Sequence, residues 1–328
     1  MASASAKRSE FLFCYDTRMA NPNGDPDENR PRIDPINGKN LVTEFRLKRT
    51  IRDYLQKIDG PIFIREDLND DGSRKTIEEL ADVYLKKSKD KRGNVKVEAV
   101  DKIKLIKEHI DVRLFGLLFA VSGVQFKQVG PVQFSIGCSL NKVYELPIRM
   151  TRVVPTREEL KAGTFGEKSV LRYSFIMFHG FLNELVGKEV NLTEEDVDKM
   201  MRGMWFGTNE LNTASKFGQV SRFLLRVIYS KPHAYIGDLN RGISLEKNGT
   251  NTDLDKLEDI SQTVLNVNEL LKMLSGNKQN IESIHFACHD AVMSNNGEVG
   301  WLASQIESWA QNNKISVRNL LTDWNRSK

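Results

Sequence analysis

The sequence predicts an α+β fold around an antiparallel sheet, and the order of its apolar patterns supports this prediction. Residues 11–17, 130–137 and 222–229 have the apolar or alternating character of strands. Residues 43–58 and 193–204 repeat apolar side chains at helical spacing. Extended segments at 148–154 and 172–178 complete the order strand, helix, two or three strands, helix, strand. This order is typical of a ferredoxin-like, or RRM-like, core.

The first predicted strand, FLFCYDT at 11–17, leads into a loop that is rich in helix-breaking residues. Residues 21–40, NPNGDPDENRPRIDPINGKN, contain four prolines and two glycines, which exclude a helix or a central strand. Thr43 is then a suitable N-cap for the first helix. The expected apolar stripe of that helix consists of Leu47, Ile51, Tyr54, Leu55 and Ile58.

The other side of this first helix is predicted to be basic. A helical wheel places Phe45, Arg49, Arg52 and Gln56 opposite the apolar stripe, with Arg46 and Lys48 on its flanks. Residues 30–57 hold eight Lys or Arg and three acids, a local net charge of +5 in a chain whose net charge is +4. Because the remaining residues nearly cancel, the basic excess is one compact patch.

Two insertions interrupt the predicted core. Residues 60–110 hold 23 charged residues in 51, and the run KKSKDKR at 86–92 is typical of an exposed, partly mobile segment. Between the strands at 148–154 and 172–178 lies a polar stretch that fits the tip of a protruding hairpin. It contains Arg157, Lys161, Gly163, Gly166 and Lys168.

The remaining elements follow from the same periodicities. In 130–137 we expect Val132, Phe134 and Ile136 to face the core. Thr193 and the acids after it begin a helix that buries Val197, Met200, Met201 and Met204. Phe223, Leu225, Val227 and Tyr229 alternate with Arg222, Leu224 and Arg226 in a last core strand. Residues 231–328 form an α/β addition with an amphipathic helix near Leu254–Leu274, an apolar segment at Ile281–Ala287 and a helix at Trp301–Trp309.

Composition and cysteine usage narrow the class of protein. The 328 residues are 40% hydrophobic and 28% charged, which is ordinary for a globular chain. The three cysteines, Cys14, Cys138 and Cys288, are far apart and fit free thiols in a reducing cytoplasm. The amino terminus MASASAKRSE lacks an apolar core, and no run approaches the ~20 apolar residues that cross a bilayer. We therefore expect no export and no membrane partner.

The loop from Arg18 to Asn40 and the basic helix together fit a nucleic-acid backbone. The loop exposes backbone amides, its Asn and Arg side chains donate hydrogen bonds, and it leads directly into the basic helix. Phosphate oxygens require donors of this kind. The alternative is a solvated loop beside a solvated helix face, which is what most charge runs are.

Four stretches resemble CRISPR-associated family seven of the RAMP superfamily, the backbone subunit of type I CRISPR interference (Cascade) complexes, most closely its type I-B form. They are NPNGDPDENRPRID with GKNLVTEFRLKRTIRDYL, DVRLFGLLFA at 111–120, GPVQFSIGCS at 130–139, and RYSFIMFHGFLN at 172–183. They occur in the family's order across residues 8–230, which is far more specific than one short motif.

The resemblance implies a non-catalytic subunit that packs head to tail along a crRNA and presents it for pairing with a target DNA strand. It implies an RRM-like palm at 8–59 and 111–230, a finger insertion at 60–110 and a thumb hairpin at 146–171, with residues 231–328 as an addition. The implied partners are further copies of this chain, a Cas-five-type subunit, the large Cascade subunit and the guide-processing endonuclease. The implied RNA-binding residues are Arg18, Asn21, Arg46, Lys48, Arg49 and Arg52, and the candidates for an apolar thumb wedge between bases are Met150, Val153, Val154 and Phe165.

Two alternatives to this interpretation remain open. Related type III backbone subunits cleave bound RNA with an Asp in a comparable loop, and this loop holds Asp25, Asp27, Glu28 and Asp34. Asp beside Pro and Gly is, however, standard turn chemistry, so we expect these acids to form turns. The second alternative is a generic single-strand RNA-binding module with stacking aromatics on its sheet.

The segment HFACHD is the one cluster of metal-ligating residue types in the sequence. Strand alternation would place His285 and His289 on one face and Cys288 and Asp290 on the other. This arrangement disfavours a shared metal. His179, next to Gly180 at a strand end, is expected to be a structural histidine. We therefore expect no metal site and no cofactor.

Overall fold

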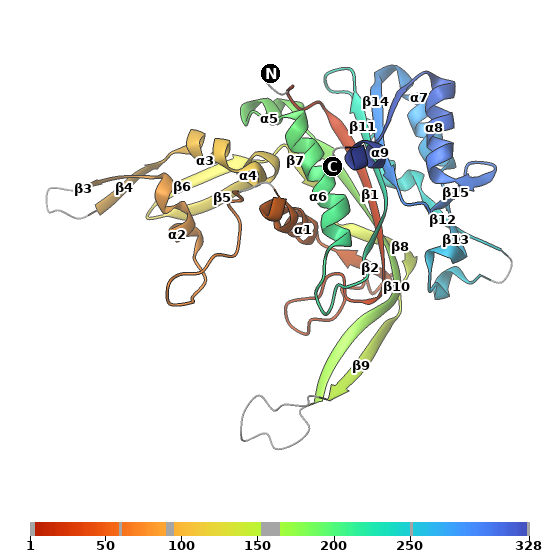
Figure 1. Ribbon diagram of the computed structural model, residues 1–328, viewed down its shortest axis with the longest axis horizontal. Coiled ribbons are helices and arrows are strands. Elements are labelled where there is room, and N and C mark those ends of the chain that lie inside the picture. The colour runs from red at the N-terminus through yellow and green to blue at the C-terminus, as the bar shows by residue number, and fades with distance from the viewer. Residues whose placement is uncertain (1–3, 59–60, 90–94, 152–164, 250–251, 327–328) are drawn as a thin grey trace. The chain divides into compact units, whose positions relative to one another are not determined.

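The computed structural model describes residues 4–58, 61–89, 95–151, 165–249 and 252–326 (Figure 1). The chain divides into two compact units. The first unit comprises Met1–Ser9, Lys48–Phe134 and Gly180–Gly207, and the second comprises Glu10–Leu47, Ser135–His179 and Thr208–Lys328.

The main sheet contributes most of its strands to the second unit. These strands are β1 (Ser9–Ala20), β2 (Lys39–Val42), β8 (Gly137–Lys142), β9 (Glu145–Thr151), β10 (Phe165–Leu182), β11 (Val220–Tyr229), β14 (Ile281–Cys288) and β17 (Ser316–Asn319). Their order in the sheet is β17-β14-β11-β1-β10-β8-β2, and β9 also pairs with β10. β10 pairs antiparallel with β8 and β9, as do β11 with β14 and β2 with β8, whereas β14 and β17 are parallel. The fold is therefore mixed α/β with mainly antiparallel sheets.

The central position of β1 explains its apolar sequence. β1 lies between β11 and β10 in the sheet, and every residue from Phe11 to Tyr15 is buried. This confirms the predicted buried strand at 11–17. The proline-rich loop that follows contains only isolated bridges, Gly24 with Pro31 and Ile33 with Asn40, before the edge strand β2.

One strand prediction is wrong in detail. The segment 130–137 is not one strand: β7 (Val132–Phe134) ends before β8 begins, and Ile136 is 56% exposed. The predicted last core strand is present as β11, and residues on both of its faces are buried. Arg226 is 1% exposed, and its guanidinium lies 5.8 Å from the ring centre of Phe11. The Arg226 face of β11 is covered by residues from distant parts of the chain, such as Phe11 of β1. Local alternation along β11 cannot show this cover.

The carboxy-terminal part adds a second, four-stranded sheet in the order β12-β13-β15-β16. Its strands are β12 (Ser244–Lys247), β13 (Thr263–Asn266), β15 (Met293–Asn295) and β16 (Val299–Trp301), and its helices are α7 (Asn268–Gly276), α8 (Leu302–Asn313) and α9 (Leu320–Arg326). The predicted apolar segment Ile281–Ala287 lies in the strand β14, and the predicted helix at Trp301–Trp309 is present as α8. The single helix near Leu254–Leu274 is wrong. Asp253 and Asp259 cap short 3-10 turns, Leu254–Lys256 and Ile260–Gln262, and β13 separates these turns from α7.

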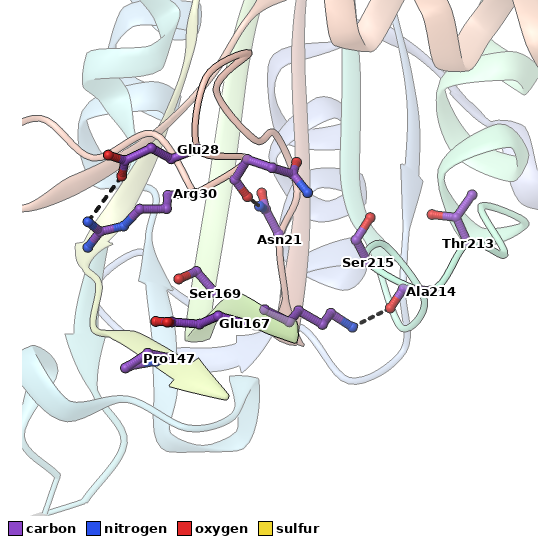
Figure 2. Close-up of a pocket in the computed structure, with 11 residues that line it drawn as sticks. Asn21, Glu28, Arg30, Pro147, Glu167, Ser169, Thr213, Ala214 and Ser215 are labelled. Atoms are coloured by element: carbon purple, nitrogen blue, oxygen red, sulfur yellow. Dashed lines mark hydrogen bonds and ion pairs between the residues drawn. The ribbon is translucent and has the colours of Figure 1, made fainter. Parts of the chain in front are cut away.

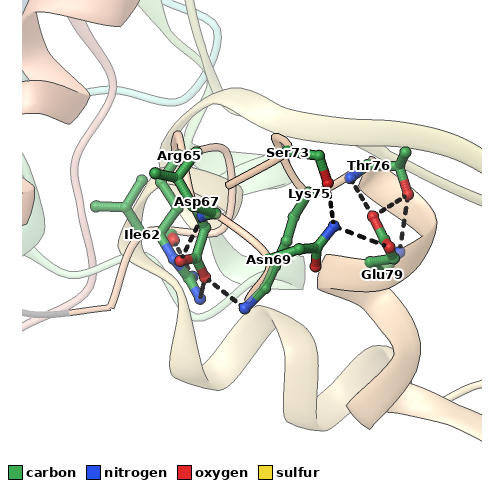
Figure 3. Close-up of polar contacts among 9 residues, drawn as sticks. Ile62, Arg65, Asp67, Asn69, Ser73, Lys75, Thr76 and Glu79 are labelled. Carbon is green, nitrogen blue, oxygen red and sulfur yellow. Dashed lines mark hydrogen bonds and ion pairs between the residues drawn. The ribbon is translucent and has the colours of Figure 1, made fainter. Parts of the chain in front are cut away.

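The first unit holds the charged insertion. It contains α2 (Ile77–Ala81), β3 (Leu85–Lys89), β4 (Val95–Val100), α3 (Lys102–Glu108), α4 (Ile110–Phe115), β5 (Gly116–Val121), β6 (Val124–Val129) and α5 (Glu184–Glu189). Stacked rings of Phe63, Phe119 and Phe126 form part of its core. Figure 3 shows the polar contacts that hold the segment before α2, including Arg65 to the Ile62 carbonyl oxygen at 2.7 Å. The described part of the insertion is thus folded within the first unit, where it shares a hydrophobic core with residues up to Phe126.

The amphipathic helices predicted at 43–58 and 193–204 are confirmed. α1 spans Glu44–Ile58 and α6 spans Glu194–Asn209. Thr43 and Thr193 cap them, each accepting a hydrogen bond from the backbone N–H three residues on. Leu47, Ile51 and Leu55 are buried as expected, whereas Ile58 is exposed. The four predicted apolar residues of α6 are all buried.

Within the first unit, α1 and α6 approach closely because α6 carries glycine where they meet. A Cβ on Gly203 would lie 3.0 Å from Ile51, and one on Gly207 would lie 3.0 Å from Tyr54. Tyr54 also stacks on Phe206 at 6.3 Å between ring centres. Among the described residues, no helix is both long and apolar enough to cross a membrane.

Candidate nucleic-acid interface

The acidic side chains of the loop 21–40 shape its turns. The Asp25 carboxylate accepts hydrogen bonds from the backbone N–H groups of Asp27, Glu28 and Arg30, at 3.0, 2.7 and 3.2 Å. These bonds, that of Glu28 first, hold the pKa of Asp25 below its ordinary value. Asp34 similarly accepts from the Ile36 N–H at 2.9 Å. The prediction that these acids form turns is confirmed for Asp25 and Asp34.

Asparagine side chains hold the same loop from inside. The Asn21 amide donates to the Asn29 carbonyl oxygen at 2.7 Å, and Asn21 is only 2% exposed. The Asn23 Oδ1 accepts from the backbone N–H and the hydroxyl of Thr43, at 2.8 and 3.0 Å. The loop is therefore internally fixed at the start of α1. Asn21, predicted to contact RNA, donates its amide within the protein.

Arg18 and Arg46 are the predicted cations of the second unit. Arg18 is exposed near the end of β1 and precedes Met19, whose φ of +52° marks a left-handed backbone turn. Arg46 lies in the first turn of α1 and is half-buried. Both side chains therefore project from element ends that flank the loop 21–40.

Lys48 and Arg52, in the first unit, form hydrogen bonds with other side chains of the protein. Lys48 is 7% exposed, and its Nζ donates to Gln133 Oε1 at 2.8 Å. Arg52 Nε donates to Asp111 Oδ2 at 3.0 Å. Both cations also lie over the ring of Phe115, at 5.6 and 5.2 Å from its centre. The wheel places Lys48 on a flank of the apolar stripe, and this flank of α1 is covered in the structure.

Arg49 is the more accessible cation on this part of α1. Its Nε donates to Asp53 Oδ1 at 2.6 Å, and its Nη2 lies 3.4 Å from Glu66 Oε1. All three side chains of this cluster are partly exposed. Such pairs exchange with solvent readily, so Arg49 can give up a carboxylate for a phosphate at little cost.

A cavity of about 810 Å³ opens in the second unit between the loop 21–30, the base of the β9–β10 hairpin and the turn after α6 (Figure 2). Arg30 binds Glu145 of β9 with two hydrogen bonds, at 2.7 and 2.8 Å. Lys168 of β10 donates to the Ala214 carbonyl oxygen. These contacts fix the hairpin base on both sides. The lining residues are Asn21, Glu28, Asn29, Arg30, Pro147, Glu167, Lys168, Ser169, Thr213, Ala214 and Ser215.

The thumb-wedge candidates are only partly within the described residues. Val153 and Val154 lie outside them. Met150 pairs with Gly166, and Phe165 pairs with Thr151, in the antiparallel register of β9 and β10. The wedge assignment therefore stays a prediction.

The segment HFACHD lies at the end of β14, where β11 is its neighbour. His285 is opposite Arg226 in the register, and Cys288 is opposite Phe223. Burial raises the pKa of the Cys288 thiol to about 12, and His289 Nδ1 lies 3.4 Å from an Arg222 nitrogen. Among the described residues, no group of three or more His, Cys, Asp or Glu could hold a metal ion.

The predicted site omitted residues that the structure brings to the same region. Arg30 and Lys168 fix the hairpin base, and Lys216 lies in the turn after α6. Arg30 was visible in the basic patch, but its partner Glu145 is 115 residues away. The turn after α6 carries one lysine and no charge cluster, so no local signal could have identified it.

Comparison with known proteins defines the class of this chain. Residues 7–266 match the family model described as CRISPR-associated protein Cas7. The chain is 30% identical over 301 residues to a CRISPR-associated protein Cas7 of Haloferax volcanii, a match that covers 85% of this chain and 86% of that protein. A chain of a CRISPR RNA-guided surveillance complex, pre-nicking, has the same fold, with a TM-score of 0.54 and 10% identity over 95% of this chain and 96% of that one. The chain belongs to the Cas7 family.

Proposed function

We propose that this protein is the crRNA-binding backbone subunit of a type I CRISPR interference complex, of the I-B form, and that it acts in the cytoplasm. The observation that carries the proposal is the Cas7 family match, which includes the loop 21–40, α1, the hairpin and β11 in one continuous range. A helical row of copies arises when each subunit contacts the next through two different surfaces. The other partners are a Cas-five-type subunit, the large Cascade subunit, the guide-processing endonuclease and the target DNA strand.

In this proposal the hand-like architecture maps onto the described elements. The RRM-like palm consists of β1, α1, β8, β10, α6 and β11. The finger insertion is the part of the first unit at 60–110, and the thumb is the β9–β10 hairpin within 146–171. Residues 231–328 form the addition with the four-stranded sheet.

The loop 21–40 and the start of α1 grip the RNA backbone without reading sequence. Of the six RNA-binding residues predicted from the sequence, Arg18, Arg46 and Arg49 are the ones proposed to contact RNA phosphates. Asn21 holds the loop in the second unit from within, and Lys48 and Arg52 hold α1 within the first unit, because their polar atoms bind other parts of the same unit. Phosphate contacts position a nucleic acid but specify no sequence, so base pairing of the guide supplies the specificity.

The subunit is proposed to be non-catalytic. Asp25 and Asp34 accept hydrogen bonds from their own loop, which is sufficient to explain why acids stand there. Cleavage is tested by incubating the purified protein with labelled RNA and Mg²⁺ or Mn²⁺, alongside Asp25→Ala and Asp34→Ala. RNA cleavage that either substitution abolishes would overturn the non-catalytic proposal.

Two measurements test the binding proposal. RNA that copurifies with the protein is expected to consist of discrete repeat-flanked guides, whereas a broad mixture would indicate a general RNA-binding module. In anisotropy titrations, Arg18→Ala with Arg46→Ala is expected to weaken binding equally for unrelated single-stranded RNAs. The salt slope should fall by about 1 to 2. Lys278→Ala, which removes an exposed lysine from a turn before β14, is the matched control.

A further inference from the structure

The turn Thr213–Gly218, between α6 and β11 in the second unit, has a fixed backbone and two prominent side chains. The N–H groups of Lys216 and Phe217 both donate to the Thr213 carbonyl oxygen at 3.0 Å. Gly218 closes the turn with a φ of +86°, a conformation that favours glycine. The backbone of the turn therefore presents residues 216 and 217 together at its tip.

Two hydrogen bonds fix this turn against the loop and the hairpin described above. The Asn21 N–H donates to the Ser215 carbonyl oxygen at 2.7 Å. Lys168 of β10 donates through its Nζ to the Ala214 carbonyl oxygen. The turn is therefore a third wall of the cavity, and its tip has a defined position beside the end of β1.

Lys216 is a half-buried cation with an unusual environment. Its Nζ donates to the Ser215 hydroxyl at 3.2 Å, and among the described residues no carboxylate lies within 4.0 Å of it. Burial, and then the charge of Arg46, lower the pKa of Lys216. A partly desolvated ammonium under the field of a second cation is stabilised by an anion that contacts it.

Phe217 is the neighbouring side chain and is 71% exposed. An isolated exposed phenylalanine needs no explanation by itself. Here it stands next to the cation at the tip of an ordered turn. Proteins that bind single strands combine a cation for the backbone with an aromatic ring on which a base stacks. The turn supplies both groups on adjacent residues.

We propose that the turn Thr213–Gly218 is a further RNA-contact element, in which Lys216 binds a backbone phosphate and the Phe217 ring stacks on a base. The inference rests on the proposed RNA-binding function and adds a base contact to it. Stacking accepts any base, since every base has a π face. The contact is therefore compatible with a guide of any sequence.

The test uses the full chain, freed of copurified RNA, and single-stranded RNAs of unrelated sequence in anisotropy titrations at several salt concentrations. Lys216→Ala is expected to lower the salt slope by ~0.7, the value for one phosphate contact on a single strand. Phe217→Leu keeps an apolar side chain but removes the ring, and is expected to weaken binding about 5- to 100-fold with an unchanged slope. Phe217→Tyr keeps the ring and should restore the affinity.

The outcomes separate this inference from the proposed function. If the wild-type protein binds RNA but Lys216→Ala and Lys278→Ala have the same slope, the phosphate contact is wrong and the proposed function stands. If Phe217→Leu and Phe217→Tyr bind equally, the stacking contact is wrong. If the wild-type protein binds no RNA, both the inference and the proposed function fall. Circular dichroism and urea unfolding of each variant confirm that it is folded, and Lys216→Gln replaces the alanine variant if that one is not.

Discussion

The ion pair between Arg52 and Asp111 makes it possible to test whether Arg52, a cation of α1, stabilises the fold or binds RNA. The Asp111 side chain is fully buried, and that of Arg52 is 13% exposed. The carboxylate accepts from Arg52 Nε at 3.0 Å and from the backbone N–H groups of Phe63 and Ile64 at 2.9 and 3.1 Å. Arg52→Ala would leave a buried carboxylate without its cation.

Removing one partner of a buried ion pair costs ~3 to 5 kcal/mol of unfolding free energy. The two backbone donors remain in the variant and still solvate part of the Asp111 charge. We therefore expect the lower end, about 3 kcal/mol. Arg52→Lys should cost less, because it keeps the charge but loses the planar guanidinium over Phe115.

Urea unfolding followed by circular dichroism measures this effect. The Arg52→Ala midpoint should fall by about 1 M or more, given slopes of ~1 to 3 kcal/mol/M. Arg49→Ala is the control from the same helix, because its partly exposed i,i+4 pair with Asp53 contributes only ~0.3 to 0.5 kcal/mol. The reasoning is refuted if Arg52→Ala unfolds within about 1 kcal/mol of the wild type. It is equally refuted if this variant changes the RNA salt slope while its midpoint is unaltered.

Three further predictions concern the second unit. Arg30→Glu should release the hairpin base and speed amide hydrogen exchange in β9. Adding Glu145→Arg to this variant should restore the protection. Equal exchange in the wild type and both variants would show that the Arg30–Glu145 pair does not hold the hairpin. Gly137→Ala places a methyl group 2.4 Å from the Phe178 ring and should cost ~1 to 3 kcal/mol in urea unfolding, so an unshifted midpoint would contradict the packing described. Burial alone would raise the pKa of Glu10, but hydrogen bonds from a histidine, a tyrosine hydroxyl and two backbone amides hold it below its ordinary 4.5. The ionised form therefore favours the folded state above pH 4.5, and this stability is lost as the pH falls through the lower folded-state pKa. Glu10→Gln should flatten the pH profile of stability in that acid range, and a profile as steep as that of the wild type would count against this assignment.

Elements determined by neighbouring residues could be predicted from the sequence. Thr43 and Thr193 cap their helices with bonds that span three residues, and the buried strand at 11–17 carries its apolar character in its own composition. The turns formed by Asp25 and Asp34 are also local, because their acceptor bonds reach two to five residues along the chain. Each of these features depends on short-range chemistry.

Features determined by distant segments could not be predicted in this way. Leu265 falls within the helix predicted near Leu254–Leu274, yet it lies in β13, where it pairs with Ser294 of β15. Ile136 fits the alternation of a strand but lies where β7 has ended and β8 has not begun. Periodicity reports which side of an element is apolar, whereas the covering segment is chosen by tertiary packing.

The charge patch shows how the same limit affects the inference of function. A local +5 was counted along the sequence, but the acids that bind Arg30 and Arg52 lie 115 and 59 residues away. A net charge summed over residues 30–57 alone therefore overstates the positive charge that is available to a phosphate. Few cations per copy then contact RNA, so binding to one copy should be weak and only moderately salt-dependent. In the proposed row of copies along one guide, effective concentration multiplies such contacts. Tight guide binding is then expected to depend on assembly rather than on the strength of a single site.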